Sequence, residues 1–502
     1  MSNPLVPPAA PAKIVEPSPS WLDRVWPRLP GAAGRRAVGG VGVCAVVSVS
    51  VLVWNSPGIS WFVVALAVTI TAIVARWQMP PATARARIER IGWTCAALAL
   101  TAIASIRADG WLDTWCVLAA IACGSLAVAG GRTIAGLGLG SIAVFIAASR
   151  AGAWLGRGLR QLRRGTPERM RLGRTAAISG LLVVLFGTLF ITADEGFAHL
   201  VSRLVPPLDG PAFGRSIGGL VIVTPIALGT AYLAAAAPPF DRLPAGPTRV
   251  ARRFEWALPL ALLDLLFASF VVVQLEFLFG GRSRVERTTD LTYAEYARSG
   301  FWQLLVVAAL TLVVIAVAAR VAPRESRPDR ILLRTLLGML GVLTLVIIAS
   351  ALSRLKVYDD AYGFTRERVA VGVIETWLGV VFALILAAGV TLRAGWLPRA
   401  AVATAVLALL ATAIADPDSV IANHDIDRYQ RTGRIDVVYL SGLSADAIIA
   451  LERLPEPLRS CASDPIFSRL QAPDDWRSWN LDRARARAAR HSDPDAQASC
   501  YR

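Results

Sequence analysis

Two apolar runs and the polar link between them decide the fold of this chain. Residues 256–278 read WALPLALLDLLFASFVVVQLEFL, and residues 301–320 read FWQLLVVAALTLVVIAVAAR. Each run is long enough to cross the hydrocarbon core of a bilayer as an α-helix. The link carries charges of both signs over 282–290 and continues as LTYAEYARSGF over 291–301. This pattern predicts two membrane helices joined by an amphipathic helix on the outer face.

The same kind of run recurs along the whole chain. Hydrophobic residues make up 55% of the sequence, the mean hydropathy is +0.53, and the apolar residues come in blocks of about 17–23. A soluble protein of this size would instead scatter them at helical or strand spacing. We therefore predict an all-α polytopic transmembrane helical bundle of about 11–12 spans with a small helical C-terminal tail domain. The twelve candidate runs lie at roughly 38–54, 59–75, 91–106, 111–130, 133–149, 175–193, 214–237, 256–278, 301–319, 331–352, 370–392 and 397–415.

Shifts in composition divide the chain into four parts. Residues 1–37 are rich in Pro and Ala, which predicts a disordered or interfacial N-terminal segment. Residues 38–174 hold the N-terminal transmembrane helices and a basic loop, and residues 175–415 hold a transmembrane core with amphipathic outer loops. Residues 416–502 are polar with dispersed Leu and Ile, which predicts a helical tail.

The net charge of +16 comes mostly from arginines in short loops between apolar runs. Orientation signals and anionic lipid headgroups explain such arginines, and no compact basic domain exists to bind nucleic acid. The predicted partner is therefore the lipid bilayer, and nucleic acid is excluded. The positive-inside rule places Arg-rich loops in the cytoplasm, and balanced loops and the tail outside a bacterial inner (plasma) membrane. The Arg-rich loops are 150–174, 238–255 and 320–334, and the balanced loops are 194–213, 282–300 and 353–369.

The first five runs disagree with that orientation. Five crossings before Arg150 would place the N-terminus outside, although Arg24, Arg28, Arg35 and Arg36 favour the inside. Two explanations stay open: one early run does not cross the membrane, or these arginines are overridden.

The chain shows no pattern of a catalytic, cofactor or metal site. Its three histidines are far apart, and its six cysteines lack metal-ligand spacing. We therefore predict no cofactor and no metal, and the lack of a visible nucleophile–base pair argues against an enzyme. Cys461 and Cys500 lie in the tail and would pair only if the tail faces an oxidising compartment.

Three polar residues are candidates for a function inside the membrane. Asp194 follows an apolar run, where a carboxylate either binds a cation or proton or, as we favour, caps the next helical turn. Asp264 and Gln274 lie ten residues apart in one run, about 80° around a helix. They either line one cleft or, as we favour, hydrogen-bond to neighbouring helices.

The outer link at 291–301 carries aromatic and charged side chains at helical spacing. Its start fits a capping box, after which Tyr293 and Tyr296 form a stripe with Glu295 and Arg298 beside it. This spacing favours an interfacial helix anchored by tyrosines over an outer ligand site.

A second outer link repeats these residue types. Arg354, Tyr358 and Tyr362 recur every four residues and share one helical face. Gly363 suits a C-cap and Thr365 an N-cap, which predicts a helix–turn–helix at the outer surface. Its role stays open, because Tyr and Arg serve lipid, protein and ligand contacts alike.

The tail contributes four charged candidates, Asp418, Arg428, Asp436 and Asp446. We favour a buried polar network of these residues that holds the tail to the membrane domain. A divalent-metal site is the alternative, although the spacing of the carboxylates is not that of an EF-hand loop.

Several motifs together resemble a bacterial membrane family. They are QLxxLFGG at 274–281, YAEYARxGF at 293–301, RLxxYxxAYGFTxxR at 354–368, DxxYLxxLSADA at 436–447 and DWRSWNLxR at 475–483. The family is known only as domain of unknown function 4153/4173, and the resemblance covers roughly residues 180–490. It implies a multi-pass membrane fold and its topology, and it implies no activity.

Two functional classes stay open. The favoured class is a binding, scaffolding or signalling component of the cell envelope, because the recognisable motifs gather on the outer face. There they would meet an envelope protein or a small ligand. The alternative is a transporter or permease-like protein with an intramembrane polar cleft at Asp264 and Gln274.

Overall fold

The computed structural model describes residues 21–52, 57–77, 83–163, 179, 210–243, 252–280, 301–323, 326–391, 394–471 and 473–489. These residues form helices and connecting turns and contain no strand, which confirms the predicted all-α class. The helices of the membrane part are α1 (Trp21–Val25), α2 (Arg35–Val51), α3 (Ile59–Arg76), α4 (Ala84–Ile103), α5 (Gly110–Ala129), α6 (Ile134–Arg163), α9 (Gly210–Ala235), η1 (Phe240–Arg242), α10 (Arg253–Gly280), α13 (Phe301–Val321), α14 (Arg327–Tyr362), α15 (Arg366–Thr391) and α16 (Leu397–Ala415).

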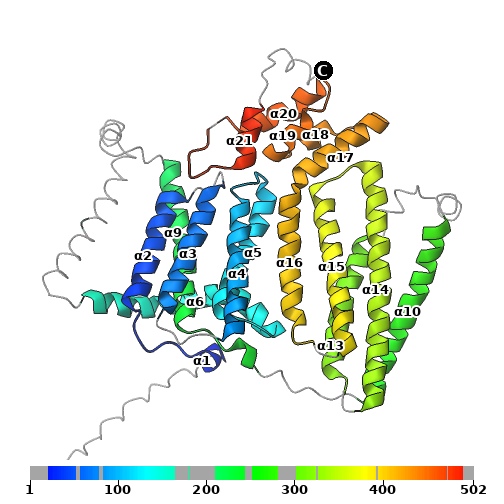
Figure 1. Cartoon of the computed structure of the whole chain (residues 1–502), viewed down its shortest axis with the longest axis horizontal. Coiled ribbons are helices and arrows are strands. Elements are labelled where there is room, and N and C mark those ends of the chain that lie inside the picture. Colours follow the sequence, from blue (N-terminus) through cyan, green and yellow to red (C-terminus); the bar gives the residue numbers. More distant parts are fainter. Residues whose placement is uncertain are drawn as a thin grey trace, which may run out of the picture.

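A second set of shorter helices forms the tail. They are α17 (Pro417–Thr432), α18 (Val437–Ser441), η2 (Ala445–Ala447), α19 (Ile448–Leu451), α20 (Leu458–Arg469) and α21 (Leu481–Ala488). Figure 1 shows these helices as a cap over one end of the upright helices. We call this end of the bundle the tail end and the opposite end, which carries Arg85, Arg132, Arg253 and Arg327, the basic end.

Nine of the described helices are long and apolar enough to cross a membrane. Helices α2 and α4 fall outside that set but run beside them, α2 against α3 and α9, and α4 against α5. The turn after α4 reaches the tail, where Ser105 accepts a backbone hydrogen bond of 3.0 Å from Leu481. The apolar run at 175–193 lies outside the described residues.

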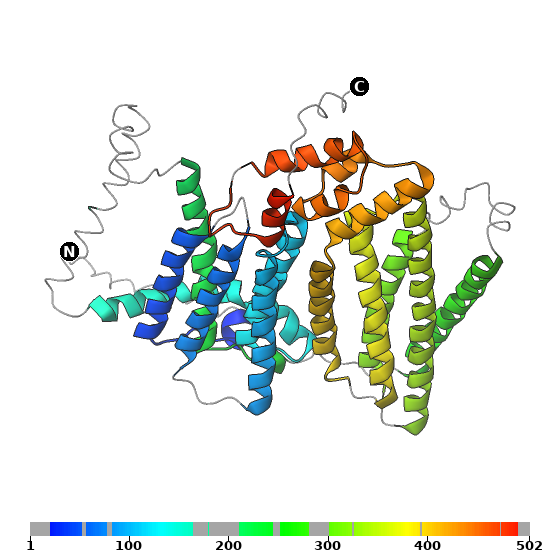
Figure 2. The same ribbon diagram turned by 45° about the horizontal axis from the view of Figure 1, so that its top comes forward.

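Helix α6 is long enough to cross but lies across the basic end instead (Figures 1 and 2). Just before it, Thr133 donates its backbone N–H to Asp241, which follows α9, at 2.9 Å. Near its other end, Arg157 donates to the carbonyl of Leu29 at 2.7 Å, in the segment that precedes α2. Both ends of α6 are thus held by segments of the basic end, as in an interfacial amphipathic helix.

This arrangement favours the explanation that one early run, at 133–149, does not cross the membrane. With α6 at the basic end, the segment before α2, the end of α6 and the starts of α10 and α14 all lie on one side. Arg24, Arg28, Arg35 and Arg36 therefore share that side with the described arginines of the loops at 238–255 and 320–334. The N-terminal arginines then agree with the orientation predicted from the later loops, because both place the basic end in the cytoplasm.

Two groups of helices make up the bundle, an N-terminal group of α2 to α9 and a C-terminal group of α10 to α15, and α16 packs between them. In the C-terminal group, α14 packs on α10, α13 and α15 around the buried side chains of Leu340, Ile347 and Phe382. Helix α16 contacts α15 on one side and α4 and α5 on the other. It runs directly into the tail through Asp416, whose φ of 60° turns the chain between α16 and α17.

The tail has an apolar core of its own. Ile421, Ile426, Leu440, Leu443 and Leu451 are almost completely buried in it. Three residues of the bundle, Ala108, Phe364 and Val369, pack against this core. The tail therefore forms a packed unit that is continuous with the membrane part.

We predict that positions 132 and 160, at the two ends of α6, lie on the same side of the membrane. Arg132→Cys and Arg160→Cys, each in a background without native cysteines, should show equal accessibility to a membrane-impermeant thiol reagent in intact cells. Glu452→Cys, exposed on the tail, should show the opposite accessibility. Opposite labelling at positions 132 and 160 would mean that α6 crosses the bilayer.

Candidate functional site: the junction between tail and bundle

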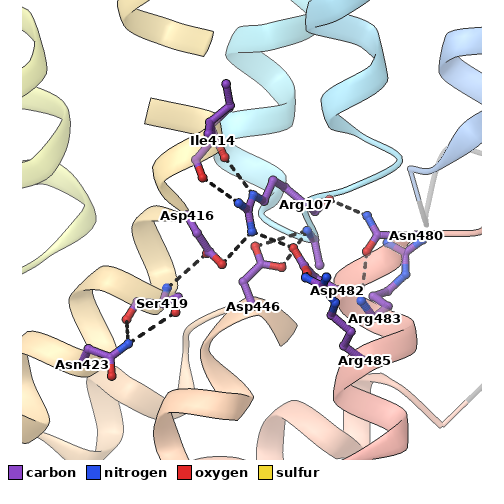
Figure 3. A network of polar contacts seen from close by, with 12 residues as sticks. Arg107, Ile414, Asp416, Ser419, Asn423, Asp446, Asn480, Asp482, Arg483 and Arg485 are labelled. Carbon is purple, nitrogen blue, oxygen red and sulfur yellow. Dashed lines mark hydrogen bonds and ion pairs between the residues drawn. The ribbon is translucent and has the colours of Figure 1, made fainter. Parts of the chain in front are cut away.

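The junction is built around Arg107, in the short turn between α4 and α5. Its Nη1 donates to Asp416 at 2.6 Å and to Asp482 at 2.9 Å. Its Nε and Nη2 donate to the carbonyls of Ala413 and Ile414, both at 2.8 Å. One guanidinium thus joins the α4–α5 turn, the end of α16 and α21 (Figure 3).

The tail also binds the backbone of this turn. Asn480 is completely buried, and its amide donates to the carbonyls of Ala104 and Arg107 at 3.0 and 2.5 Å. Its Oδ1 accepts the N–H of Arg483 at 3.0 Å and so caps α21. The last carbonyls of a helix have no partner within the helix, and Asn480 supplies one for α4.

A second clamp joins α15 to the tail. The carboxylate of Asp418 is fully buried, accepts Arg366 Nε at 2.8 Å and accepts the backbone N–H of Ser444 at 2.7 Å. The backbone N–H of Arg366 donates to the hydroxyl of Tyr439 at 2.8 Å. Asp109, also buried, lies 3.7 Å from the Arg366 guanidinium.

The turn between α14 and α15 is held by α17. Asp425 accepts the N–H of Phe364 at 2.8 Å, and Arg428 donates to the carbonyl of Ala361 at 3.2 Å. The ring of Phe364 stacks on His424 with centroids 3.9 Å apart. Gly363 has a φ of 88°, and a Cβ there would lie 2.6 Å from Asp425, so this contact requires glycine.

The tail also touches the start of α3. Ile59 and Ser60 donate their N–H groups to the carbonyls of Trp479 and Arg477, at 3.2 and 3.0 Å. A Cβ on Gly58 would lie 2.5 Å from the backbone of Ser478. The tail is therefore bonded to both helix groups of the bundle.

Burial dominates the electrostatics of the junction. It raises the pKa of Asp416 to about 6, against the opposing effect of Arg107. It also raises the pKa of Asp109 and of Asp446, to which the negative charges of neighbouring carboxylates add. Asp446 accepts the backbone N–H of Ala108 at 3.0 Å. Each of these carboxylates is therefore harder to ionise in the folded protein than in water.

Three of the four charged tail candidates lie at the junction, and the fourth does not. Asp418, Arg428 and Asp446 contact α15, the α14–α15 turn and the α4–α5 turn respectively. Asp436 was placed wrongly in this network: it is exposed and accepts the N–H of Tyr439 at 2.9 Å. An N-cap of a surface helix keeps its side chain at its own helix, so it cannot reach across the junction.

The candidates on α10 and α14 form a separate contact. Gln274 Oε1 accepts hydrogen bonds from Arg354 and, at 3.3 Å, from Ser350, and so ties α10 to α14. The rings of Tyr358 and Tyr362 contact each other at a tilt of 52°, with centroids 4.9 Å apart. Asp264 is buried, and its carboxylate has no hydrogen-bond partner among the described residues.

The remaining candidates cannot be placed. Asp194, Tyr293, Glu295, Tyr296 and Arg298 lie outside the described residues. In the part of the chain that the structure describes, no group of three or more His, Cys, Asp or Glu side chains could hold a metal ion. Cys461 is disulfide-bonded, and its expected partner Cys500 lies outside the described residues.

The central residues of the junction, Arg107, Asp109, Arg366 and Asp482, were not among the sequence candidates. One signal could have identified Arg107 and Asp109. They stand in a turn of a few residues between two apolar runs, where a pair of opposite charges serves no orientation role. Arg366 and Asp482 lie within recognised motifs but at positions that the motifs leave variable.

The chain belongs to the family described as Domain of unknown function (DUF4153), whose sequence model matches residues 94–454. No curated protein and no solved structure matches the chain. The match starts further toward the N-terminus than the motifs indicated, and it includes the α4–α5 turn with Arg107. It ends before Asn480 and Asp482, so part of the junction lies beyond the matched residues.

We predict that the raised pKa of Asp416 makes the junction weaken as pH rises. A carboxyl group with a folded-state pKa of about 6 and an ordinary value of 3.8 stabilises fully below pH 3.8, and this contribution is lost as pH rises through 6. The loss amounts to up to about 3 kcal/mol. Asp416→Asn keeps the N-cap of α17 and should lower the slope between pH 4 and 6 when thermal unfolding of the tail is followed at pH 4 to 8. Part of the slope should remain, because Asp109 and Asp446 keep their own raised pKa values.

Asp427→Asn is the matched control for that experiment. Asp427 is an exposed carboxylate of the same helix that pairs with Arg453 at 2.6 Å. Its substitution should leave the slope between pH 4 and 6 as in the wild type. An unchanged slope in Asp416→Asn would contradict the assignment.

Proposed function

We propose that this protein is a binding component of the cell envelope, in which a multi-pass membrane anchor presents the helical tail on the outer face of the plasma membrane. The observation that carries the proposal is the junction itself. Arg107 and Arg366 bind the tail from separate points of the bundle, and Asn480 of the tail binds the α4–α5 turn. A flexibly tethered domain would not need buried polar contacts of this kind.

A rigid attachment is useful to a protein that binds a partner. Association costs free energy for each loop or domain that becomes ordered, and a domain that is already fixed avoids that cost. The tail also shows apolar side chains to its surroundings: Val438 is 83% exposed and Ile449 is 56% exposed. Exposed apolar side chains of this size suit a protein partner.

Two observations support an outward-facing tail. The arginines near the N-terminus and after α9 lie at the basic end, which the positive-inside rule assigns to the cytoplasm. The disulfide at Cys461 suits an oxidising compartment.

Transport is the second candidate function, and Asp264 is the observation that favours it. A carboxylate buried within a membrane helix and without a hydrogen-bond partner among the described residues is costly, and such groups often mark an ion pathway. The contacts of Gln274 with α14 weigh against the predicted cleft, because its oxygen already serves helix packing.

The two candidates are separated by crosslinking in intact cells. A photoreactive residue at position 438 should capture one defined envelope protein, and Ile449→Arg should lower the yield about tenfold or more. Glu452→Arg, an exposed position nearby, is the matched surface control and should leave the yield unchanged. Asp264→Leu should also leave it unchanged.

Capture that is lost in Asp264→Leu but kept in Ile449→Arg would contradict the binding role of the tail surface. The same result would favour a function that depends on the membrane helices.

A further inference from the structure

Two hollows lie one below the other along the same side of the bundle. The upper hollow, of about 820 Å³, lies at the tail end between α5, α13, α14, α15 and the tail. The lower hollow, of about 590 Å³, lies between α5, α6, α13, α15 and α16. Both volumes are in the range of small-molecule sites.

The register of α5 shows that the two hollows follow one another. Trp111 and Trp115 line the upper hollow, and Ala119, Ala122 and Leu126 line the lower one. These residues are spaced by four, four, three and four positions, so they lie on one face of the helix. They extend over about 22 Å of helix, which exceeds the thickness of one leaflet of the hydrocarbon core.

Helices α13 and α15 repeat this order. Trp302 lines the upper hollow and Leu312 the lower one, about 15 Å further along α13. On α15, Val371 belongs to the upper hollow, and Val381 and Ile385 belong to the lower one. Three helices thus contribute side chains to both hollows, and on α5 these side chains lie on one continuous face.

The two hollows differ in polarity in the same way as the acyl chains and the headgroup of a lipid. The lower hollow is lined almost entirely by aliphatic side chains. The upper hollow combines Arg366, Glu367 and Arg368 with five aromatic side chains, of which Trp115 and Trp302 are largely exposed. Tryptophan and tyrosine with charged neighbours are typical of the membrane–water interface.

The charges in the upper hollow favour a headgroup with both signs. Arg368 stacks over the Tyr358 ring at 4.1 Å and lies 3.9 Å from Asp359. Arg366 is paired with Asp418 and flanked by Asp109. Glu367 is exposed and makes no ion pair with a described residue. A purely anionic headgroup would meet two guanidiniums and four carboxylates, whereas a phosphate next to an amine would match both.

We propose that these hollows form a binding site for one phospholipid with a zwitterionic, amine-bearing headgroup. The phosphate binds beside Arg366 and Arg368, and the amine pairs with Glu367. The acyl chains descend along α5 into the lower hollow. The proposal concerns the membrane part and does not depend on the partner proposed for the tail.

The test uses the purified full-length protein, freed of native lipid and titrated with defined lipids under native mass spectrometry. Dioleoyl phosphatidylethanolamine should bind with one saturable site, more tightly than dioleoyl phosphatidylglycerol. Glu367→Lys should weaken phosphatidylethanolamine binding about tenfold, the value of one charge-assisted hydrogen bond. Glu452→Lys makes the same charge change on the tail and should have no effect.

A second variant tests the lower hollow separately. Ala122→Trp fills it and should weaken phosphatidylethanolamine binding without changing the preference over phosphatidylglycerol. Equal binding of the two lipids to the wild type, tighter binding of phosphatidylglycerol, or unchanged affinity in Glu367→Lys would each overturn the proposal. Proportional, unsaturated uptake of both lipids, which indicates annular lipid only, would overturn it as well.

Discussion

The whole arrangement depends on one guanidinium, that of Arg107, at the tail end of the bundle, whose side chain is 13% exposed. Arg107 binds two carboxylates and two backbone carbonyls that belong to α16, α21 and the segment between α16 and α17. Removing one partner from a buried ion pair leaves an unpaired charge, which typically costs about 3–5 kcal/mol. Because the contacts of Arg107 come from segments more than 300 residues apart in the sequence, this residue fixes the long-range topology.

The carboxylates of the junction do more than attach the tail, because they also contact the bundle near the two hollows. Burial raises the pKa of Asp109, Asp416 and Asp446, so these groups ionise less readily in the packed state than in water. The same acids contact the turns that lead into α5 and α15, the helices that line the two hollows. Some residues therefore both attach the tail and line the upper hollow. Arg366 is the clearest example of such a residue.

Much of the fold could be predicted from the sequence, because hydrophobic length is a local property. Runs such as 301–319 specify helices without knowledge of their neighbours. Helix α6 shows where prediction from local composition fails. Its composition permits a crossing, whereas its contacts with Asp241 and Leu29, which composition does not reveal, hold both ends at one side. The junction was predictable in kind but not in detail. Acids of the tail motifs indicated buried contacts, whereas the role of Arg107 needs three distant segments brought together.

The most direct test of this account is hydrogen exchange of the tail amides in detergent-solubilised protein. Arg107→Ala should raise exchange across α17 and α21 by at least about a hundredfold, since breaking a buried pair costs about 3 kcal/mol or more. Arg485→Ala removes an exposed partner of the same Asp482 carboxylate, 3.1 Å away, and should change exchange by less than about fivefold. Equal exchange in the two variants would contradict the claim that Arg107 holds the tail to the membrane part.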